Sequence, residues 1–390
     1  MLKRIFTVLI IFCCATPAFT QKRTTPIHII FDSDMGPDYD DVGAITILHT
    51  FADRGEAKIL ATIASTKYEG VAGVLNVFNT YFNRPNIPIG VPKGYALDLR
   101  DFQHWTDTLL VKYPHQIKTN AEAEDAVTLY REILAKQPDH SVTIVTIGFL
   151  TNLSNLLNTG ADSFSSLSGK ELVKKKVELL VCMGGKFPSG YEFNVMKDAP
   201  ASKNVYQNWG TPVIFSGFEI GEKIKVGLPL IHNDAIKNSP VKDVFSLSIP
   251  QAAEDSVGRK SWDETAVLVA LRGYSRWYTL HPGRIVMAPD GSNSWDENGT
   301  GQSYLVEKVD YKEVQNLINQ LIMHQPLKIA GKKTAAVVLP QSNTGQPKIG
   351  NHGYTTARVT KILKVRENVR RIQARVDKVE AQIARAEAKN

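Results

Sequence analysis

Apolar residues between positions 27 and 322 follow two alternating patterns. Short, continuous apolar runs, typical of strands buried on both faces, occur at 27–31, 59–64, 87–91, 142–147, 177–183, 212–216 and 285–288. Segments with apolar residues three or four positions apart predict helices at 42–48, 71–81, 121–135, 150–157, 199–209, 262–271 and 309–322. This alternation predicts an α/β fold with an open, mostly parallel sheet and helices on both faces. Between 220 and 250 the pattern is weak.

The first twenty residues have a different character. Lys3 and Arg4 precede an apolar stretch at 5–15, and small residues around Pro17 follow it. This order is typical of a secretory signal peptide, and the apolar stretch is too short to span a bilayer comfortably. We therefore expect export to the periplasm or the medium, with residues 1–20 removed and a main domain at 24–330.

The chain changes character again after residue 330. Residues 331–354 are rich in Gly, Pro, Ser, Thr, Asn and Gln, which predicts a linker. Residues 355–390 carry apolar positions spaced by three and four, with Arg and Lys on the other faces, which predicts a basic, heptad-patterned helix. This helix could pair with a second copy as a coiled coil, pack on its own domain, or contact an anionic envelope surface.

The 390-residue chain has a formal net charge of +7, with 43% hydrophobic and 22% charged residues. From residue 358 to the end, ten Lys or Arg oppose four Asp or Glu, so nearly all of the excess positive charge lies in the tail. The remainder is close to neutral and gives no basis for nucleic-acid binding. After removal of the signal peptide, Cys182 is the one remaining cysteine, and its apolar strand predicts a buried core residue.

Five carboxylates follow the first predicted strand within ten positions, at Asp32, Asp34, Asp38, Asp40 and Asp41. Carboxylates so close together repel one another unless a cation holds them, and a hard divalent ion with oxygen ligands is the natural candidate. They lie at the turn between a strand and a helix. In an open α/β sheet, ligands bind at such turns.

Taken alone, an apolar strand that ends in Asp-x-Asp has two interpretations. The first Asp could be a phosphoryl-accepting nucleophile, as in haloacid-dehalogenase-like phosphatases, or the carboxylates could bind a cation that activates water for hydrolysis. The adjacent pair Asp40 and Asp41 favours the second interpretation, because two acids at a helix N-terminus can divide between a metal and a substrate.

The acidic stretch resembles the N-terminal signature of the inosine-uridine-preferring nucleoside hydrolases, in a longer form similar to a bacterial branch of that family. Further blocks that resemble the family follow in its order: Gly148 to Leu153, Met183-Gly184-Gly185, Glu192-Phe193-Asn194, Asp198 to Ala201, and Trp262-Asp263. The resemblance covers about residues 27–327. It implies the family's fold and hydrolysis of the N-glycosidic bond of nucleosides.

The resemblance also implies a calcium site formed by Asp34, Asp41, the backbone carbonyl group of Thr151, and Asp263. Calcium accepts such a mixture of carboxylate and carbonyl oxygens. Asp34 would also be the general base that takes a proton from water.

On the substrate side, the resemblance implies that Asp40, Glu192 and Asn194 bind the ribose hydroxyl groups. We expect Asp32 to support the turn, since alternate residues of a strand face opposite sides, and Asp38 to support it or cap the helix.

The sequence departs from the family's pattern around the base. Lys67 lies in a segment where the family has Gly-Asn, Lys186 stands in place of an Asn, and Trp262 replaces a His. The two lysines would favour an anionic substituent such as a phosphate, or would lie in solvent. Other candidate contacts to the base are three residues of one predicted loop: His104, Trp105 and His115.

These features predict an exported, calcium-dependent N-ribohydrolase that releases ribose and a free base from nucleosides or related N-ribosides, in purine or pyrimidine salvage. The alternative is a non-catalytic, calcium-dependent ribose or polyol binder on the same fold, which the altered residues Lys67, Lys186 and Trp262 motivate. The phosphatase is the third interpretation.

Overall fold

The computed structural model describes residues 25–327. The predicted signal peptide at 1–20, linker at 331–354 and basic helix at 355–390 lie outside these residues and stay predictions. Within 25–327, no helix is both long enough and apolar enough to cross a membrane.

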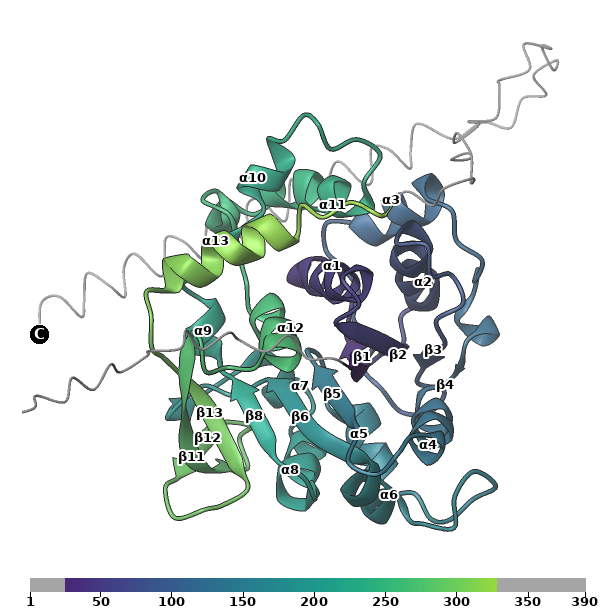
Figure 1. Cartoon of the computed structure of the whole chain (residues 1–390), viewed down its shortest axis with the longest axis vertical. Helices are drawn as coiled ribbons and strands as arrows, with labels where there is room; N and C mark the ends of the chain where they lie inside the picture. The colour runs from purple at the N-terminus through teal and green to yellow at the C-terminus, as the bar shows by residue number, and fades with distance from the viewer. Residues whose placement is uncertain (1–24, 328–390) are drawn as a thin grey trace, which may run out of the picture. The chain divides into compact units, whose positions relative to one another are not determined.

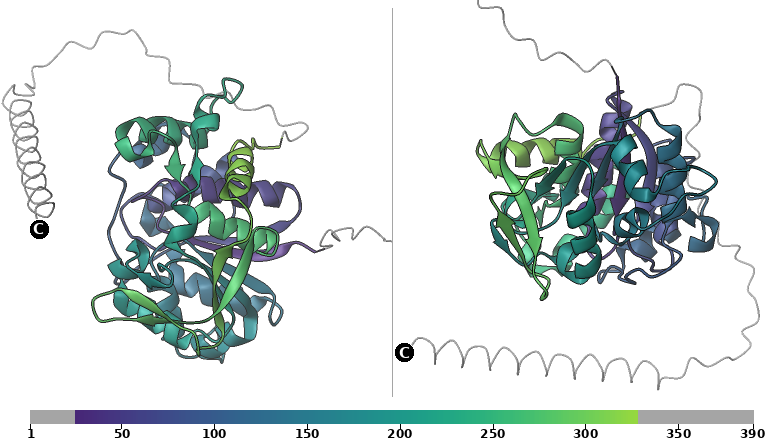
Figure 2. Two further views of the ribbon diagram at one scale, coloured as in Figure 1. Left: turned by 90° about the vertical axis from the view of Figure 1, so that its left-hand side faces the viewer. Right: turned by 90° about the horizontal axis from the view of Figure 1, so that it is seen from below.

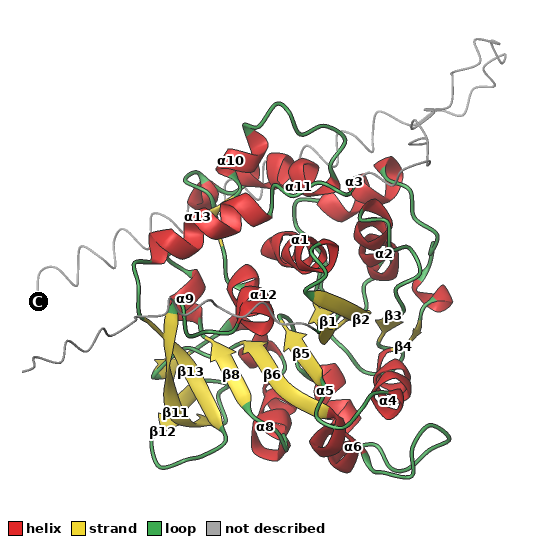
Figure 3. Cartoon of the chain, viewed as in Figure 1, coloured by secondary structure: helices red, strands yellow, loops and turns green. Residues whose placement is uncertain are grey.

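One eleven-stranded sheet forms the middle layer of the described residues (Figure 1 and Figure 3). Its order is β4-β3-β2-β1-β5-β6-β8-β13-β11-β12-β7, and a separate two-stranded sheet pairs β9 with β10. The strands are β1 (Ile27–Ser33), β2 (Ala57–Ala64), β3 (Ile89–Val91), β4 (Glu124–Asp125), β5 (Val142–Thr146), β6 (Val177–Met183), β7 (Ser189–Gly190), β8 (Val213–Ser216), β9 (Lys225–Val226), β10 (Arg259–Lys260), β11 (Tyr278–Met287), β12 (Asn293–Asp296) and β13 (Gln302–Glu307).

Helices cover both faces of the large sheet, as Figure 1 shows. They are α1 (Asp40–Asp53), α2 (Val71–Tyr81), α3 (Trp105–Lys112), α4 (Ala126–Lys136), α5 (Thr151–Leu157), α6 (Gly169–Lys176), α7 (Phe193–Lys197), α8 (Ala199–Asn208), α9 (Phe218–Gly221), α10 (Leu228–Ile231), α11 (Pro240–Ser248), α12 (Asp263–Arg272) and α13 (Tyr311–Leu321).

The sheet has a separate hydrophobic core on each face, because successive strand residues point to opposite sides. Phe31 of β1 and Val145 of β5 belong to the core that includes residues of α1, α2, α12 and α13. Their neighbours Ile30 and Ile144 belong to the core that includes residues of α4, α5, α6 and α8. Strands buried on both faces explain why their sequences are continuously apolar.

The sheet order reverses between β1 and β5. β1 pairs in parallel with β2 on one side and with β5 on the other, so the chain leaves β1 in one direction along the sheet and later continues in the opposite one. Such a point leaves a crevice outside the carboxyl ends of the two strands. The acidic stretch begins at this end of β1.

The predicted α/β fold, with a mostly parallel sheet and helices on both faces, is confirmed for the described residues. One predicted element is wrong at its start. The helix expected at 121–135 begins at Ala126, because the Asp125 side chain accepts the backbone N–H of Thr128 and caps the helix there. The residues just before it form a 3₁₀ turn (Asn120–Glu122) and the short strand β4 instead.

The antiparallel end of the sheet is largely missing from the sequence prediction. β11 runs over ten residues rather than 285–288, and it pairs antiparallel with β12 and β13. Figure 1 and the right-hand view in Figure 2 place these green strands at one edge of the described residues. The weakly patterned stretch at 220–250 contains β9 and α10, which bury one residue each, and the nine-residue helix α11, which buries five.

Candidate active site

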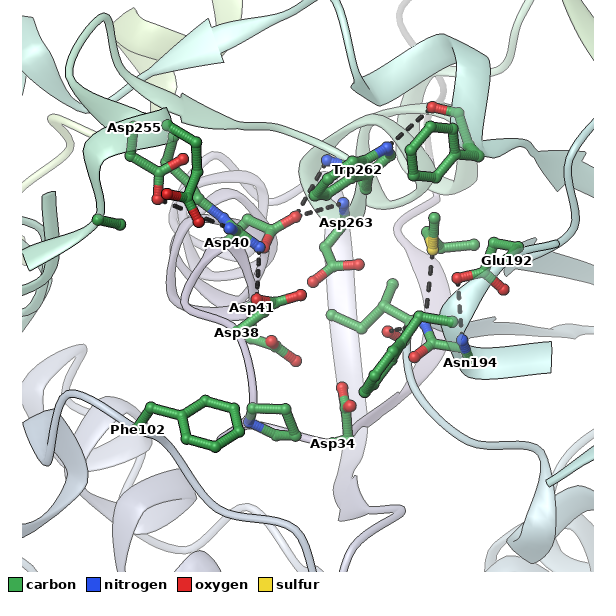
Figure 4. Close-up of a pocket in the computed structure, with 18 of the residues that line it drawn as sticks. Asp34, Asp38, Asp40, Asp41, Phe102, Glu192, Asn194, Asp255, Trp262 and Asp263 are labelled. Carbon is green, nitrogen blue, oxygen red and sulfur yellow. Dashed lines mark hydrogen bonds and ion pairs between the residues drawn. The ribbon is translucent and has the colours of Figure 1, made fainter. Parts of the chain in front are cut away.

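A cavity of about 340 Å³ opens at the carboxyl ends of β1, β5 and β6 (Figure 4). This volume is in the range of small-molecule sites. One guanidinium group, that of Arg259, and eight carboxylates line it: Asp34, Asp38, Asp40, Asp41, Glu192, Glu254, Asp255 and Asp263. Six acids named from the sequence therefore lie in one place, together with two acids, Glu254 and Asp255, and with Arg259, which the sequence did not suggest.

Hydrogen bonds fix the turn that carries the acidic stretch from β1 to α1. The backbone N–H of Met35 donates to Ser33 Oγ (2.9 Å) and to Asp41 Oδ1 (3.1 Å). The Tyr68 hydroxyl donates to the Met35 carbonyl oxygen (2.7 Å), and the Tyr68 ring packs so closely on Gly36 that an added Cβ would lie 2.8 Å from it. The turn thus holds the carboxylates against the cavity.

Three carboxylates of the cavity lining, those of Asp34, Asp41 and Asp263, are buried. Burial, followed by the charge of Asp41, raises the pKa of Asp34 well above its usual range. Burial, followed by the charge of Asp40, raises the pKa of Asp41 to about 7 and that of Asp263 well above its usual range. A divalent cation among these groups would offset both the burial and the repulsion.

The ligand atoms fit such an ion. One carboxylate oxygen each from Asp40, Asp41 and Asp263 lie within 4.8 Å of one another, which is the span that ligands of a single ion have. Asp41 Oδ2 is buried and has no hydrogen-bond partner, so it is available as a ligand. Asp34 lines the same cavity but is not part of this closest group.

Asp40 is surrounded by donors from the protein itself. Its Oδ1 accepts hydrogen bonds from Arg259 Nε (3.1 Å) and Nη2 (2.8 Å). Its Oδ2 accepts the backbone N–H groups of Trp262 (3.0 Å) and Asp263 (3.3 Å). Both Asp40 oxygens therefore already accept hydrogen bonds from the protein. The sequence analysis expected Asp40 to bind ribose and did not predict these contacts.

The structure favours a different carbonyl ligand from the one expected. Thr151 does not line the cavity; it begins α5, and its hydroxyl donates to Asp198. Ile147, at the end of β5, does line it, and Gly148 packs so tightly that an added Cβ would lie 2.5 Å from the backbone nitrogen of Asp34. Ile147, and not Thr151, is therefore the residue of this segment that lines the cavity.

Glu192 and Asn194 both line the cavity, as expected. Glu192 caps α7, because its carboxylate accepts the backbone N–H groups of Asn194 (2.9 Å) and Val195 (3.0 Å). Burial raises the pKa of Glu192 to about 7. The Asn194 amide nitrogen donates to the Ile147 carbonyl oxygen (3.1 Å), which ties this helix to the end of β5.

The two expected lysines do not line the cavity. Lys67 is exposed, and Lys186 lies outside with its ammonium group 5.1 Å from the ring centre of Phe218, a lining residue. Trp262 does line the cavity, as expected, and its ring nitrogen donates to the Phe218 carbonyl oxygen (2.8 Å). The lysines therefore give no basis for an anionic substituent inside the site.

The loop expected to contact the base contributes different residues. His104 pairs with Asp107 at the surface, Trp105 is fully buried, and the His115 ring contacts the Tyr113 carbonyl oxygen, so none of the three lines the cavity. Phe102 lines it instead and leaves 84% of its surface exposed. The loop therefore reaches the cavity through Phe102 and Gln103 and not through the three residues named from the sequence.

The two remaining acids of the stretch have supporting roles. Asp32 lies outside the cavity lining and accepts hydrogen bonds from the Tyr130 hydroxyl (2.8 Å) and the Asn152 amide (3.2 Å). Asp38 does not cap α1; it forms an ion pair with Arg259 (2.8 Å). Cys182 is buried, as the sequence predicts.

The geometry can be compared with known proteins. The family model described as "Inosine-uridine preferring nucleoside hydrolase" matches residues 29–346, which is most of the chain. The chain belongs to this family. The resemblance predicted from the sequence blocks is thereby confirmed, and the family consists of enzymes that act on N-glycosyl compounds.

The individual relatives have low sequence identity to this protein. An inosine-uridine preferring nucleoside hydrolase from Leishmania major is 24% identical over 200 residues, and the match spans 48% of this chain and 60% of the relative. The structure of a plant nucleoside hydrolase superimposes with a TM-score of 0.60 at 18% identity, covering 76% of this chain and 99% of that one. The enzyme from Bacillus anthracis gives 0.58 at 14% identity, with 76% and 99% covered. At these identities the structural likeness shows the fold alone.

Proposed function

We propose that this protein hydrolyses the N-glycosidic bond of ribonucleosides or related N-ribosides, with calcium bound in the acidic cavity. The observation that supports the proposal most is the group of buried carboxylates at the switch point of the sheet, with Asp41 Oδ2 free. A hydrolase that attacks a sugar carbon needs negative charge beside it, because positive charge develops there in the transition state.

The residues that would hold calcium are Asp34, Asp41, Asp263 and the carbonyl group of Ile147. Calcium accepts six to eight oxygen ligands at flexible angles, so sugar hydroxyl groups and water could complete the set. Bound there, the ion would supply Lewis-acid chemistry by lowering the pKa of a water and would help to orient the sugar.

Side chains of the protein take the proton from the attacking water and stabilise the positive charge that develops on the sugar. Asp34 takes a proton from the attacking water, whose oxygen forms a bond to the anomeric carbon. The carbon–nitrogen bond breaks, and its electron pair stays on the base nitrogen. The neighbouring carboxylates stabilise the cationic sugar, while Glu192 and Asn194 lie close enough to the same cavity to receive its hydroxyl groups.

Aromatic side chains form the outer part of the site. Phe102, Phe193, Phe218 and Trp262 all line the cavity, and a flat base can stack on such rings. No histidine within residues 25–327 lines the cavity. Protonation of a leaving base would therefore come from a carboxylic acid or from solvent.

Release of ribose from a panel of purine and pyrimidine nucleosides tests this proposal, with reducing sugar as the readout. We expect turnover by the wild-type protein, and a loss of about 10²- to 10⁴-fold in Asp34→Asn, which keeps the shape of the side chain but cannot accept the proton. Glu178→Gln is a matched control, because Glu178 is exposed at the opposite end of β6. Equal rates in wild type and Asp34→Asn would reject the proposal.

A second candidate is a calcium-dependent ribose or polyol binder without turnover. It is favoured by Trp262 at a position where the family has His and by the absence of histidine from the cavity lining in the described part of the chain. Calorimetry with ribose separates the two candidates. Calcium-dependent binding of ribose, with no sugar released from any nucleoside of the panel, would support the binder.

A further inference from the structure

Asp40 joins the two helices that carry candidate metal ligands. It is the first residue of α1, next to Asp41, and its Oδ2 accepts the backbone N–H groups of Trp262 and Asp263 at the start of α12. An acid at a helix N-terminus satisfies N–H groups that have no partner within the helix. Through this one carboxylate, Asp41 on α1 and Asp263 on α12 are held at a fixed separation.

Arg259 completes the junction. Its Nε and Nη2 donate to Asp40 Oδ1 at 3.1 and 2.8 Å, and its Nη2 also lies 2.8 Å from Asp38. The guanidinium lies over the rings of Tyr39 (4.9 Å) and Trp262 (5.3 Å). Only 9% of the Arg259 side chain is exposed, so these contacts fix it in one geometry.

A second acid holds Arg259 from the other side. Asp255 Oδ2 lies 3.7 Å from Arg259 Nη1 and accepts the Tyr39 hydroxyl at 2.6 Å. The segment before β10 is thereby tied to the start of α1. Asp38, Asp40 and Asp255 together surround one guanidinium, which offsets part of their repulsion for the metal ligands.

We infer that Asp40 and Arg259 form a clamp that positions Asp41 and Asp263 for the metal. The inference rests on the proposed function, because the metal is part of it. Each Asp40 oxygen already accepts two hydrogen bonds, which fill the acceptor sites of a carboxylate, so a ribose hydroxyl would have to displace one of them.

A role of Asp40 in the clamp and a role in binding ribose predict different experimental results. A clamp acts on the metal before any sugar arrives, whereas a ribose ligand acts only when sugar is present. Asp40→Asn keeps the shape of the side chain but turns an N–H₂ group toward donors on one side. Arg259→Gln removes the charge that Asp40 accepts, and Arg259→Lys keeps a charge without the two-pronged contact.

Calorimetric titration of chelator-treated protein with calcium alone tests the inference. We expect Asp40→Asn and Arg259→Gln to weaken calcium binding by about 10- to 100-fold, the usual effect of losing a group that orients a metal ligand, and Arg259→Lys to retain part of the affinity. The double variant should be little weaker than the worse single variant, because the two residues act as a unit. Arg272→Gln, in the last turn of α12 and partly exposed, should bind calcium like wild type.

Two different failures can be told apart. If wild type binds no calcium, the proposed function fails in its metal dependence. If wild type binds calcium and the folded variants, checked by circular dichroism, bind it equally well, the clamp is wrong. An Asp40→Asn variant with unchanged calcium affinity and a raised KM for nucleoside would instead assign Asp40 to the ribose.

Discussion

Carboxylates of the same chemical type have different surroundings in this cavity. Asp41 keeps one buried oxygen without a partner, whereas both oxygens of Asp40 are occupied by Arg259 and by the start of α12. A free oxygen can bind a cation, and a saturated carboxylate can only hold its neighbours. At the scale of single residues, hydrogen-bond occupancy therefore distinguishes Asp41 from its neighbour Asp40.

A buried histidine outside the site gives a pH-dependent prediction. Burial, followed by the charge of Arg84, lowers the pKa of His49 from 6.5 to about 3. Below pH 6.5 the unfolded chain therefore binds a proton that the folded chain does not, so the contribution of His49 to stability, present above pH 6.5, is lost as the pH falls toward 3. Between pH 7 and pH 5 the free energy of unfolding should fall by on the order of 2 kcal/mol from this group.

Denaturant titrations of wild type and His49→Gln at both pH values measure this effect. The variant should lose less stability than wild type between pH 7 and pH 5, whereas His232→Gln, at an exposed histidine, should behave like wild type. The same pH dependence in wild type and His49→Gln would contradict the assignment.

At the scale of elements, α1 and α12 carry the proposed metal ligands Asp41 and Asp263, and the two helices pack closely. Gly43 of α1 faces the buried side chain of Glu264 on α12, so that an added Cβ would lie 2.0 Å from Glu264 Oε1. Ser261 Oγ donates to the other Glu264 oxygen (2.8 Å), which limits how far this side chain can move. The glycine thus sets the distance between the two helices.

Gly43→Ala should lower the free energy of unfolding. Overpacking a buried contact costs roughly 1–3 kcal/mol or more, which exceeds the gain of about 1 kcal/mol that alanine has over glycine in a helix. Gly94→Ala is the control, because an added Cβ there has no neighbour within 4 Å. Thermal unfolding of both variants measures the difference, and a Gly43→Ala protein as stable as wild type would show that α1 and α12 are not tightly packed.

The sequence predicts those elements whose signal is local. β1, β5 and β6 are continuously apolar because both of their faces are buried, and their ends could be located from the sequence. β9 and α10 are too short to show a period, and β11 is partly exposed, so their sequences are weakly patterned. The helix α11 buries residues at helical spacing, which the sequence prediction missed. The start of α4 depended on one capping side chain, that of Asp125.

Site residues, too, could be predicted from the sequence only where their signal is local. Asp34 and Asp41 could be found because they are close together in the sequence and follow a strand. Arg259 could not, because it lies 219 positions from Asp40 on a two-residue strand. The choice between Thr151 and Ile147 depended on which peptide reaches the cavity, and spacing along the chain does not give that.

At the scale of the whole molecule, the cavity is strongly acidic although the chain is basic. Its lining has eight carboxylates and one guanidinium, so even a bound divalent ion leaves it negative. A phosphate group adds up to about two further negative charges and would be repelled. We expect KM for inosine 5′-monophosphate to exceed that for inosine by at least about tenfold, or 1.4 kcal/mol.

Steady-state assays with the two compounds, differing only in the phosphate, measure this discrimination. High salt should reduce the difference, because salt screens charge repulsion at the mouth of the cavity. Equal KM values would mean that an unrecognised cationic group contacts the 5′ position.

The segments outside residues 25–327 carry two further proposals. We propose that residues 1–20 direct export and that residues 355–390 associate with a second copy through the heptad pattern. Light scattering of the mature chain and of a form truncated after residue 354 tests the second. The truncated form should have about half the mass, and an identical oligomeric state would contradict self-association.

The central claim is that a metal held by the acidic cavity is needed to split a nucleoside. The most direct measurement is the release of ribose from inosine by chelator-treated protein before and after calcium is added back. The account predicts a loss of turnover on chelation, and its return with calcium in wild type but not in Asp263→Asn, which lacks one proposed ligand. Turnover that persists in the chelated protein would contradict the account.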